Sequence, residues 1–273
     1  MVRVGVVGCG TIGSELARAL ERDHAQRVRI VALCDQSRAC AVTLQQHLRT
    51  HPPIVSLPTL IRRSQLVIEA ASASVSARVA RSALAAHRDV LIMSTGGLLA
   101  DRSSWQRIAR RSRGRLYVPS GALCGVDGIK AMAAGTIRRI RLTTSKPPKA
   151  LASAPYVRAK HLRLDRLRRR TLIFEGTPRQ VTTAFPHNTN VAATMLLACL
   201  SSGRTPKSVR VRVVADPALR TNRHELDLEG DAGRIRVRID SRPSATNPKT
   251  SELAVRSAMA TLRQLFEPVR IGT

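Results

Sequence analysis

A glycine-rich turn close to the start of the chain constrains the fold more than any other feature. Residues Val2–Val7 form a short apolar run typical of a buried strand, and the pattern Gly-x-Gly-x-x-Gly follows it directly over residues 8–13. The first glycine permits a tight turn, the second lets a pyrophosphate approach the backbone, and the third lets the next helix pack on the strand. We therefore expect a dinucleotide to bind at Gly8, Gly10, Thr11, Ile12 and Gly13.

The residue after the second predicted strand bears on the choice of dinucleotide. Asp35 follows the last glycine of the turn by 22 residues, which is where a carboxylate binds the hydroxyls of the adenosine ribose. Its charge repels the 2′-phosphate that distinguishes NADP from NAD. Arg38 could instead bind this phosphate, and Ser37 could add a hydrogen bond to it. We weigh the carboxylate more heavily, because a mobile, solvated arginine contributes little. The sequence therefore predicts NAD as the preferred cofactor, with NADP used less well.

Strand-like and helix-like segments alternate over the first 120 residues. The expected strands after the first are Val28–Cys34, Leu66–Ala71, Asp89–Met93 and Leu116–Val118. The expected helices are Thr11–Arg22, Ala39–Leu48, Val75–Ala86 and Trp105–Arg113. This alternation predicts an α/β fold, a doubly wound parallel sheet of the Rossmann type covered on both faces.

The pattern changes in the second half of the chain. We expect strands at Ile137–Thr144, Thr171–Glu175, Val209–Ala215, His224–Glu229 and Arg234–Asp240, with few helices between them. Apolar residues and arginines alternate cleanly in two of these strands, which is typical of an antiparallel sheet with one wet face. The main helix is expected at Asn190–Leu200 and a closing helix at Thr250–Phe266. We predict a dinucleotide-binding domain over 1–120 with 245–273 returning to it, and over 121–244 a catalytic, dimerising α+β domain on a mixed or antiparallel sheet.

The charge of the chain raises the question of nucleic acid. Lysine and arginine number 46 against 18 acidic residues, a formal net charge of +28, and 40 of the 46 are arginine. The arginines are spread along the whole chain, and aromatic residues make up only 2%, too few for a base-stacking surface. We therefore expect only non-specific, salt-sensitive attraction to nucleic acid. There is also no run of ~18 uncharged apolar residues, so no membrane partner is expected.

Few other motifs carry chemistry. The five cysteines are odd in number and have no zinc-finger spacing, so reduced thiols, a cytoplasmic location and no metal are expected. The nucleophile elbow, the phosphate-binding Walker loop and the zinc-protease motif are all missing from the sequence.

Two of the seven histidines have unusual sequence neighbours. His187 lies just before the expected helix Asn190–Leu200, and His224 lies at the start of an expected strand. Either could act as an acid or base beside a nicotinamide, because histidine titrates near neutral pH.

Several motifs in order along nearly the whole chain resemble the L-aspartate dehydrogenase family. In the first 150 residues they are the glycine-rich turn and residues 69–72, 89–94, 119–127 and 146–149. In the remaining residues they are 174–176, 188–193, 216–217 with Asn222 and His224, and 247–251. The departures are Thr189, where valine is more usual, and the abundance of arginine.

The resemblance implies a function and its residues. It implies oxidation of L-aspartate to iminoaspartate with NAD or NADP, releasing oxaloacetate and ammonia, or the reverse reaction, with the iminoaspartate available for NAD synthesis. It places the acid–base histidine at His224 and further cofactor contacts at Ala122 and Asn188. A substrate with two carboxylates needs cationic or amide donors around it. Motif position makes Lys146, Asn222 and Lys249 candidates, although capping a helix or turn would explain each equally well.

Alternatives stay open at this point. Cys124 lies in a loop resembling the nucleophile loop of aldehyde dehydrogenases, although its flanking residues match the aspartate dehydrogenase pattern instead. The chain could act on another amino or hydroxy acid, or be a non-catalytic basic sensor of NAD redox state associated with nucleic acid. We also expect a homo-oligomer, a dimer through the second domain.

Overall fold

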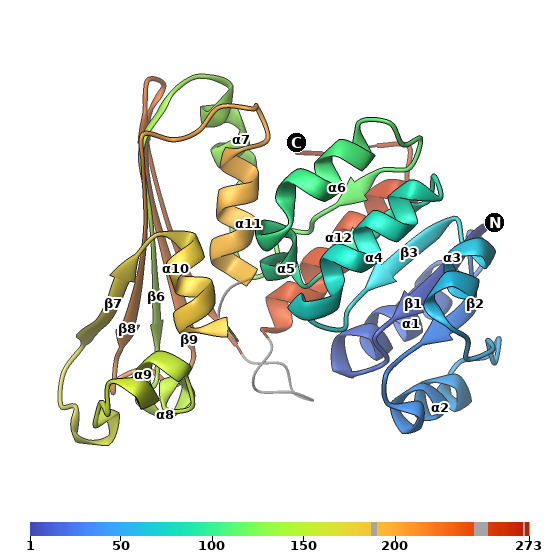
Figure 1. Cartoon of the computed structure of the whole chain (residues 1–273), viewed down its shortest axis with the longest axis horizontal. Coiled ribbons are helices and arrows are strands. Elements are labelled where there is room, and N and C mark those ends of the chain that lie inside the picture. The colour runs from blue at the N-terminus through green and yellow to red at the C-terminus, as the bar shows by residue number, and fades with distance from the viewer. Residues whose placement is uncertain (187–189, 243–250, 270, 273) are drawn as a thin grey trace. The chain divides into compact units, whose positions relative to one another are not determined.

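The chain divides into two compact units, each built around its own sheet (Figure 1). The computed structural model describes residues 1–186, 190–242, 251–269 and 271–272. Unit 1 comprises Met1–Pro119 and Val255–Arg270, and unit 2 comprises Ser120–Ala254 with Ile271–Thr273. No helix within these described ranges is both long and apolar enough to cross a membrane.

The sheet of unit 1 is entirely parallel, with the order β2-β1-β3-β4-β5. Its strands are β1 (Val2–Val7), β2 (Val28–Cys34), β3 (Leu66–Glu69), β4 (Asp89–Ile92) and β5 (Leu116–Tyr117). The chain moves outward from β1 to β2 on one side and to β3 on the other. The carboxyl ends of β1 and β3 therefore flank the switch point at which open α/β sheets bind ligands.

Helices cover both faces of this sheet. They are α1 (Thr11–Asp23), α2 (Arg38–His47), α3 (Leu57–Arg63), α4 (Ala73–Ala85), α5 (Thr95–Ala100), α6 (Arg102–Ala109) and α12 (Glu252–Phe266). Val4 and Val6 join a core that includes residues of α1, α2 and α12, while Gly5 on the other face lies against Leu60 of α3. The doubly wound α/β prediction is confirmed. The short helices α3 and α5 were not predicted, because neither is long enough to show a helical period.

The last helix belongs to the first unit. Val255, Ala258 and Leu262 of α12 are buried in the same core as the strands β1 to β4. They follow one another at spacings of three and four residues, which places them on one face of the helix. Arg27 also donates a hydrogen bond to the carbonyl of Phe266 at 2.7 Å. The chain therefore returns to unit 1 after building unit 2.

The sheet of unit 2 is mixed, with the order β10-β9-β6-β8-β7. Its strands are β6 (Ile137–Lys146), β7 (Thr171–Gly176), β8 (Ser208–Ala215), β9 (Asn222–Gly230) and β10 (Gly233–Ser241). The pair β6–β8 is parallel and the other three pairs are antiparallel. The prediction of a mixed or antiparallel sheet is therefore confirmed in its mixed form. The sequence could not choose between the two, because alternation of side chains reveals the faces of a strand but not its direction.

More helices lie before and between these strands than the sequence suggested. They are α7 (Val126–Ala134), α8 (Pro148–Leu151), α9 (Pro155–Ala159), the 3-10 turn η1 (Leu164–Arg166), α10 (Pro178–Ala184) and α11 (Asn190–Cys199). The expectation of few helices was wrong. One missed signal is a capping box at the start of α10, where Thr177 and Gln180 hydrogen-bond each other's backbone N–H groups.

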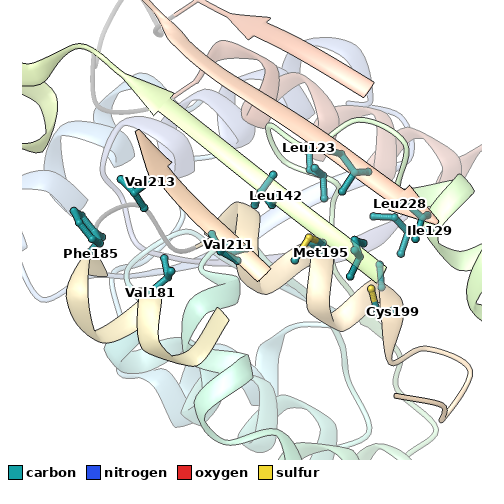
Figure 2. Close-up of a cluster of buried hydrophobic side chains, with 14 of the residues drawn as sticks. Leu123, Ile129, Leu142, Val181, Phe185, Met195, Cys199, Val211, Val213 and Leu228 are labelled. Carbon is teal, nitrogen blue, oxygen red and sulfur yellow. The ribbon is translucent and has the colours of Figure 1, made fainter. Parts of the chain in front are cut away.

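The core of unit 2 lies between one face of the sheet and the helices that cover it (Figure 2). The strands contribute Leu142, Val211, Val213 and Leu228, and α7, α10 and α11 contribute Ile129, Val181, Met195 and Cys199. The opposite face of the sheet carries arginines and carboxylates paired across the strands, such as Arg139 with Glu229 at 2.8 Å. The clean alternation in sequence thus separates a dry face from a charged one.

Candidate active site

The glycine-rich turn has the geometry that its sequence predicts. Gly8 adopts a left-handed conformation with φ of +92°, and a Cβ there would stand 2.6 Å from the backbone of Ala70 and Ala71 after β3. A Cβ at Gly13 would overlap the carbonyl oxygen of Gly8, whereas one at Gly10 would meet nothing within 4 Å. Gly8 and Gly13 are therefore required by the fold, while Gly10 leaves open space beside the turn.

Thr11 and Ile12 form the first positions of α1, directly after this space. The cap residue Gly10 makes no side-chain hydrogen bond to the helix, and the first turn of α1 contains no acidic residue. The N–H groups and the positive end of the helix dipole therefore lack a side-chain counter-charge of their own. Open space at Gly10 and an uncapped helix end fit the pyrophosphate of a dinucleotide.

Asp35 is held at the edge of this turn. Its carboxylate accepts hydrogen bonds from the N–H groups of Cys9 at 2.5 Å and Ser37 at 2.6 Å. The carboxylate therefore ties β2 to the turn after β1. Burial raises the pKa of the Cys9 thiol to about 12, and the charge of Asp35 adds to the shift. Asp35 thus brings negative charge next to the glycine-rich turn, and each of its oxygens keeps a second lone pair for a ligand.

Glu69 is a second bracing carboxylate, and its role was not predicted. It is fully buried at the end of β3 and accepts N–H bonds from Ala71 at 2.9 Å and from Ser72 and Ser94 at 3.1 Å. Burial raises the pKa of this carboxyl, and the three N–H bonds act against the shift. Ser72 and Ser94 directly precede α4 and α5, so one buried carboxylate organises the turns after β3 and β4. A glutamate ending an apolar strand was the available signal.

The loop before α7 holds Ala122 and Cys124. Ala122 is buried, and Cys124 is exposed immediately before Gly125, which adopts φ of +78° at the start of the helix. Burial and the charge of Asp127 both raise the pKa of the Cys124 thiol. The thiol is therefore protonated at neutral pH, which argues against a nucleophile of the aldehyde dehydrogenase kind. All five cysteines are free.

His224 lies on the buried face of β9, near one end of the sheet. Only 4% of the residue is exposed, and its Nδ1 lies 3.0 Å from the hydroxyl of Thr144, the residue opposite it on β6. This hydrogen bond orients the ring and leaves Nε2 for another partner. Burial lowers the pKa of His224 to about 4, with a further contribution from Lys146. The imidazole is therefore neutral at neutral pH and can accept a proton.

Lys146 ends β6 two residues after Thr144, so both lie on the face that carries His224. It is 9% exposed, and burial lowers its pKa to about 8. Most of the population therefore keeps its charge at pH 7. A buried ammonium group beside a neutral imidazole is an arrangement suited to an anionic ligand.

Asn222 completes this group. The register pairs Ser145 with Arg223, so its continuation places Asn222 beside Lys146, and Asn222 also pairs with Ser241 of β10. The structure thus brings Lys146, Asn222 and His224 together from separate stretches of the sequence. Asn188, Lys249 and His187 lie outside the described residues. Among the residues that are described, no cluster of His, Cys, Asp or Glu could hold a metal ion.

Two family models match the chain. The model described as "Aspartate dehydrogenase, C-terminal" matches residues 127–265, and the model described as "Homoserine dehydrogenase, NAD binding domain" matches residues 8–119. The first match spans β6, β9 and β10, and with them the His224 group. The second spans the glycine-rich turn, Asp35 and Glu69.

Individual proteins match over their full length. An L-aspartate dehydrogenase of Methanosarcina barkeri is 40% identical and one of Nitrosopumilus maritimus is 33% identical, with all of both chains covered in each case. The crystal structure of an aspartate dehydrogenase from Thermotoga maritima superposes with a TM-score of 0.75 at 24% identity, again over the whole of both chains. That structural likeness confirms the two-sheet fold expected from the sequence.

Proposed function

The chain belongs to the aspartate dehydrogenase family, and from this premise we propose that it oxidises L-aspartate with a nicotinamide dinucleotide. The products are iminoaspartate, which hydrolyses to oxaloacetate and ammonia, and the reduced cofactor. The observation that carries the proposal is the buried group of His224, Thr144 and Lys146 in unit 2. A protein that only sensed NAD would have no use for a buried acid–base histidine beside a buried cation.

His224 has the form and orientation of a general base. L-Aspartate carries an ammonium group, and the C=N bond can form only after this group loses a proton. When bound, the nicotinamide ring accepts the hydrogen of Cα with its two electrons. The neutral imidazole takes the ammonium proton at Nε2 while Thr144 holds Nδ1. In the reverse direction the protonated imidazole assists loss of water from the carbinolamine.

Lys146 links the pKa of His224 to the binding of a dicarboxylic substrate. In the free protein burial, and after it the charge of Lys146, hold the pKa of His224 low. A substrate carboxylate bound at Lys146 offsets that charge, and its own negative field favours the imidazolium form. The pKa of His224 therefore rises on substrate binding, toward the range in which a histidine transfers protons effectively. Asn222 and Lys249 are proposed as further carboxylate donors.

The proposed cofactor contacts are residues of the glycine-rich turn, Asp35, Ala122 and Asn188. Asp35 favours NAD, because its charge repels a 2′-phosphate and its two N–H bonds keep it beside the turn. Arg38 begins α2 in an exposed position, so NADP is proposed as the weaker cofactor. Iminoaspartate from this reaction would be available for NAD synthesis.

The direct test is to mix the purified protein with NAD and L-aspartate and follow absorbance of the reduced cofactor. We expect it to form with L-aspartate much faster than with L-malate or L-glutamate. L-Malate tests for a hydroxy acid dehydrogenase, and L-glutamate for one acting on another amino acid. NAD binding without reduction by any of the three would contradict the proposal and favour the NAD-sensing alternative.

We also propose a cytoplasmic homodimer formed through the charged face of the second sheet. Arginines on this face are paired with carboxylates: Arg234 with Asp227 and Arg212 with Glu175 at 2.8 Å, and Arg223 with Asp240 at 2.6 Å. This pairing lowers the repulsion between two copies of a chain whose net charge is +28. Sedimentation at moderate salt should give a dimer; a species of ~30 kDa alone would exclude it.

A further inference from the structure

Among the described residues of unit 2, the hydroxyl groups of two buried serines have no hydrogen-bond partner. They belong to Ser241, the last residue of β10, and to Ser251, just before α12, which are 4% and 8% exposed. The N–H of Glu252 donates to the carbonyl of Arg242 at 3.2 Å, which places Ser251 beside the end of β10. Buried polar atoms without a partner cost stability, so a group of this kind calls for an explanation.

The position of Ser241 in the sheet explains why its hydroxyl is buried without a partner. Ser241 pairs with Asn222, and the continued register places Asn222 beside Lys146. These three residues form a cross-strand row on the inner face of the sheet. The next row along contains Ile239, His224 and Thr144, and the rows after it are apolar. The polar residues of the dry face are thus gathered at one end of the sheet, around His224.

We propose that Ser241 is a substrate-binding residue whose hydroxyl donates a hydrogen bond to a carboxylate of the dicarboxylic substrate. The inference rests on the proposed function, because it assigns Ser241 to the same site as Lys146 and His224. A carboxylate accepts several hydrogen bonds, so an ammonium, an amide and a hydroxyl in one row can share one. The free hydroxyl is then a binding group that gains its partner only when substrate arrives.

The test compares three variants with the intact enzyme. Ser241→Ala removes the hydroxyl, and Ser241→Cys keeps nearly the same volume with a weak donor, so a shared effect of both is not a cavity effect. The matched control is Ser145→Ala: Ser145 is a buried serine of β6 whose hydroxyl already accepts from Arg170 at 3.4 Å. The readouts are the Michaelis constants for L-aspartate and NAD, the melting temperature, and the rise in melting temperature caused by succinate, a dicarboxylate that cannot react.

We expect both Ser241 variants to raise the Michaelis constant for L-aspartate about tenfold, as for loss of one hydrogen bond to a charged group. The constant for NAD should not change, the melting temperature should stay equal or rise, and the succinate effect should shrink. Wild-type values of the aspartate constant and of the succinate effect in Ser241→Ala would overturn the inference and leave the proposed function standing. If neither the wild-type protein nor any variant oxidises L-aspartate, but the two Ser241 variants lose the succinate effect while Ser145→Ala keeps it, the proposed function fails and Ser241 remains a dicarboxylate ligand.

Discussion

The two units present binding groups of different kinds. At the carboxyl edge of the parallel sheet, unit 1 offers backbone: an open glycine, an uncapped helix, and turns held by the buried or half-buried carboxylates of Asp35 and Glu69. At one end of the mixed sheet, unit 2 offers side chains, with Lys146 and His224 buried on neighbouring strands. Backbone groups suit a ligand that all dehydrogenases of this kind share, whereas side chains can be chosen for one substrate.

Replacing His224 by alanine should have the largest effect on activity, and the change lies in unit 2 alone. We expect turnover to fall by about 10²-fold or more, the range for loss of a general acid–base group. The Michaelis constant for NAD should change little, because NAD is expected to bind at the backbone groups of unit 1. Steady-state kinetics with both substrates checks this.

Cys124→Ser is the matched control for the His224 variant. Its thiol is exposed and protonated at neutral pH, so activity should be retained. Loss of activity in Cys124→Ser, with folding and NAD binding intact, would transfer the chemistry to the thiol. Normal turnover in the His224 variant would remove the acid–base role.

One buried group in each unit should make the free energy of unfolding depend on pH, and the two dependences should have opposite signs. The pKa of His224 falls from an ordinary 6.5 to about 4 on folding, so the unfolded chain binds the proton first as pH drops. Stability should therefore be lost as pH falls from about 6.5 to about 4, by up to ~3 kcal/mol. The pKa of Glu69 is raised instead, so its contribution weakens as pH rises above 4.5.

Denaturant unfolding of His224→Gln and Glu69→Gln over pH 4–8 separates these contributions. In the His224 variant the free energy of unfolding should fall less steeply as pH drops below about 6.5. The Glu69 variant should lose the opposing slope, in addition to weakening the turns that the carboxylate braces. A fall as steep as the wild type's in His224→Gln would mean that the imidazole is not buried as described.

Gly10→Ala tests unit 1 in the way that His224→Ala tests unit 2. A Cβ at this position meets nothing within 4 Å, so the melting temperature should not change. The added methyl group occupies the space proposed for the pyrophosphate, and the Michaelis constant for NAD should rise roughly tenfold at unchanged turnover. Gly13→Ala is the contrasting variant, since its Cβ would overlap the Gly8 carbonyl and both stability and binding should suffer. Unaltered NAD affinity in Gly10→Ala would place the cofactor elsewhere.

The smallest expected effect concerns the choice between NAD and NADP. Asp35→Ser removes the charge that repels a 2′-phosphate and should shift the preference toward NADP by roughly fivefold, a change of about 1 kcal/mol. Arg38→Ala should erode the remaining NADP activity. Catalytic efficiencies with both cofactors measure this, and a wild-type enzyme more efficient with NADP would reverse the weighting of Asp35 over Arg38.

Unit 1 could be predicted from the sequence almost in full because its signals are local. The glycine-rich turn, the strand before it and the helix after it are contiguous, and Gly8 and Gly13 each have a steric reason within this turn or the neighbouring one. The bracing role of Glu69 was missed, since its N–H partners come from two turns separated by 20 residues or more along the chain. A buried carboxylate is recognised only once those turns are placed around it.

Unit 2 shows the limit of the same reasoning. Alternation in β8 and β10 predicted strands and faces correctly, but not the parallel pairing of β6 with β8. The resemblance singled out His224, Lys146 and Asn222 by motif, and nothing in the sequence relates His224 to Thr144, 80 residues earlier. Ser241 carried no signal at all, because a serine at the end of a strand is ordinary until its hydroxyl is found buried and unpartnered.

The sequence by itself determined the class of fold, the dinucleotide turn, the family and the identity of the proposed acid–base residue, since each depends on residue types at short, fixed spacings. Only the tertiary structure decided strand register, and with it which side chains share the buried end of the sheet. Register sets which polar groups leave water together, and burial beside one another is what shifts the pKa values of His224 and Lys146. The chemistry of this site therefore depends on contacts that no local pattern encodes.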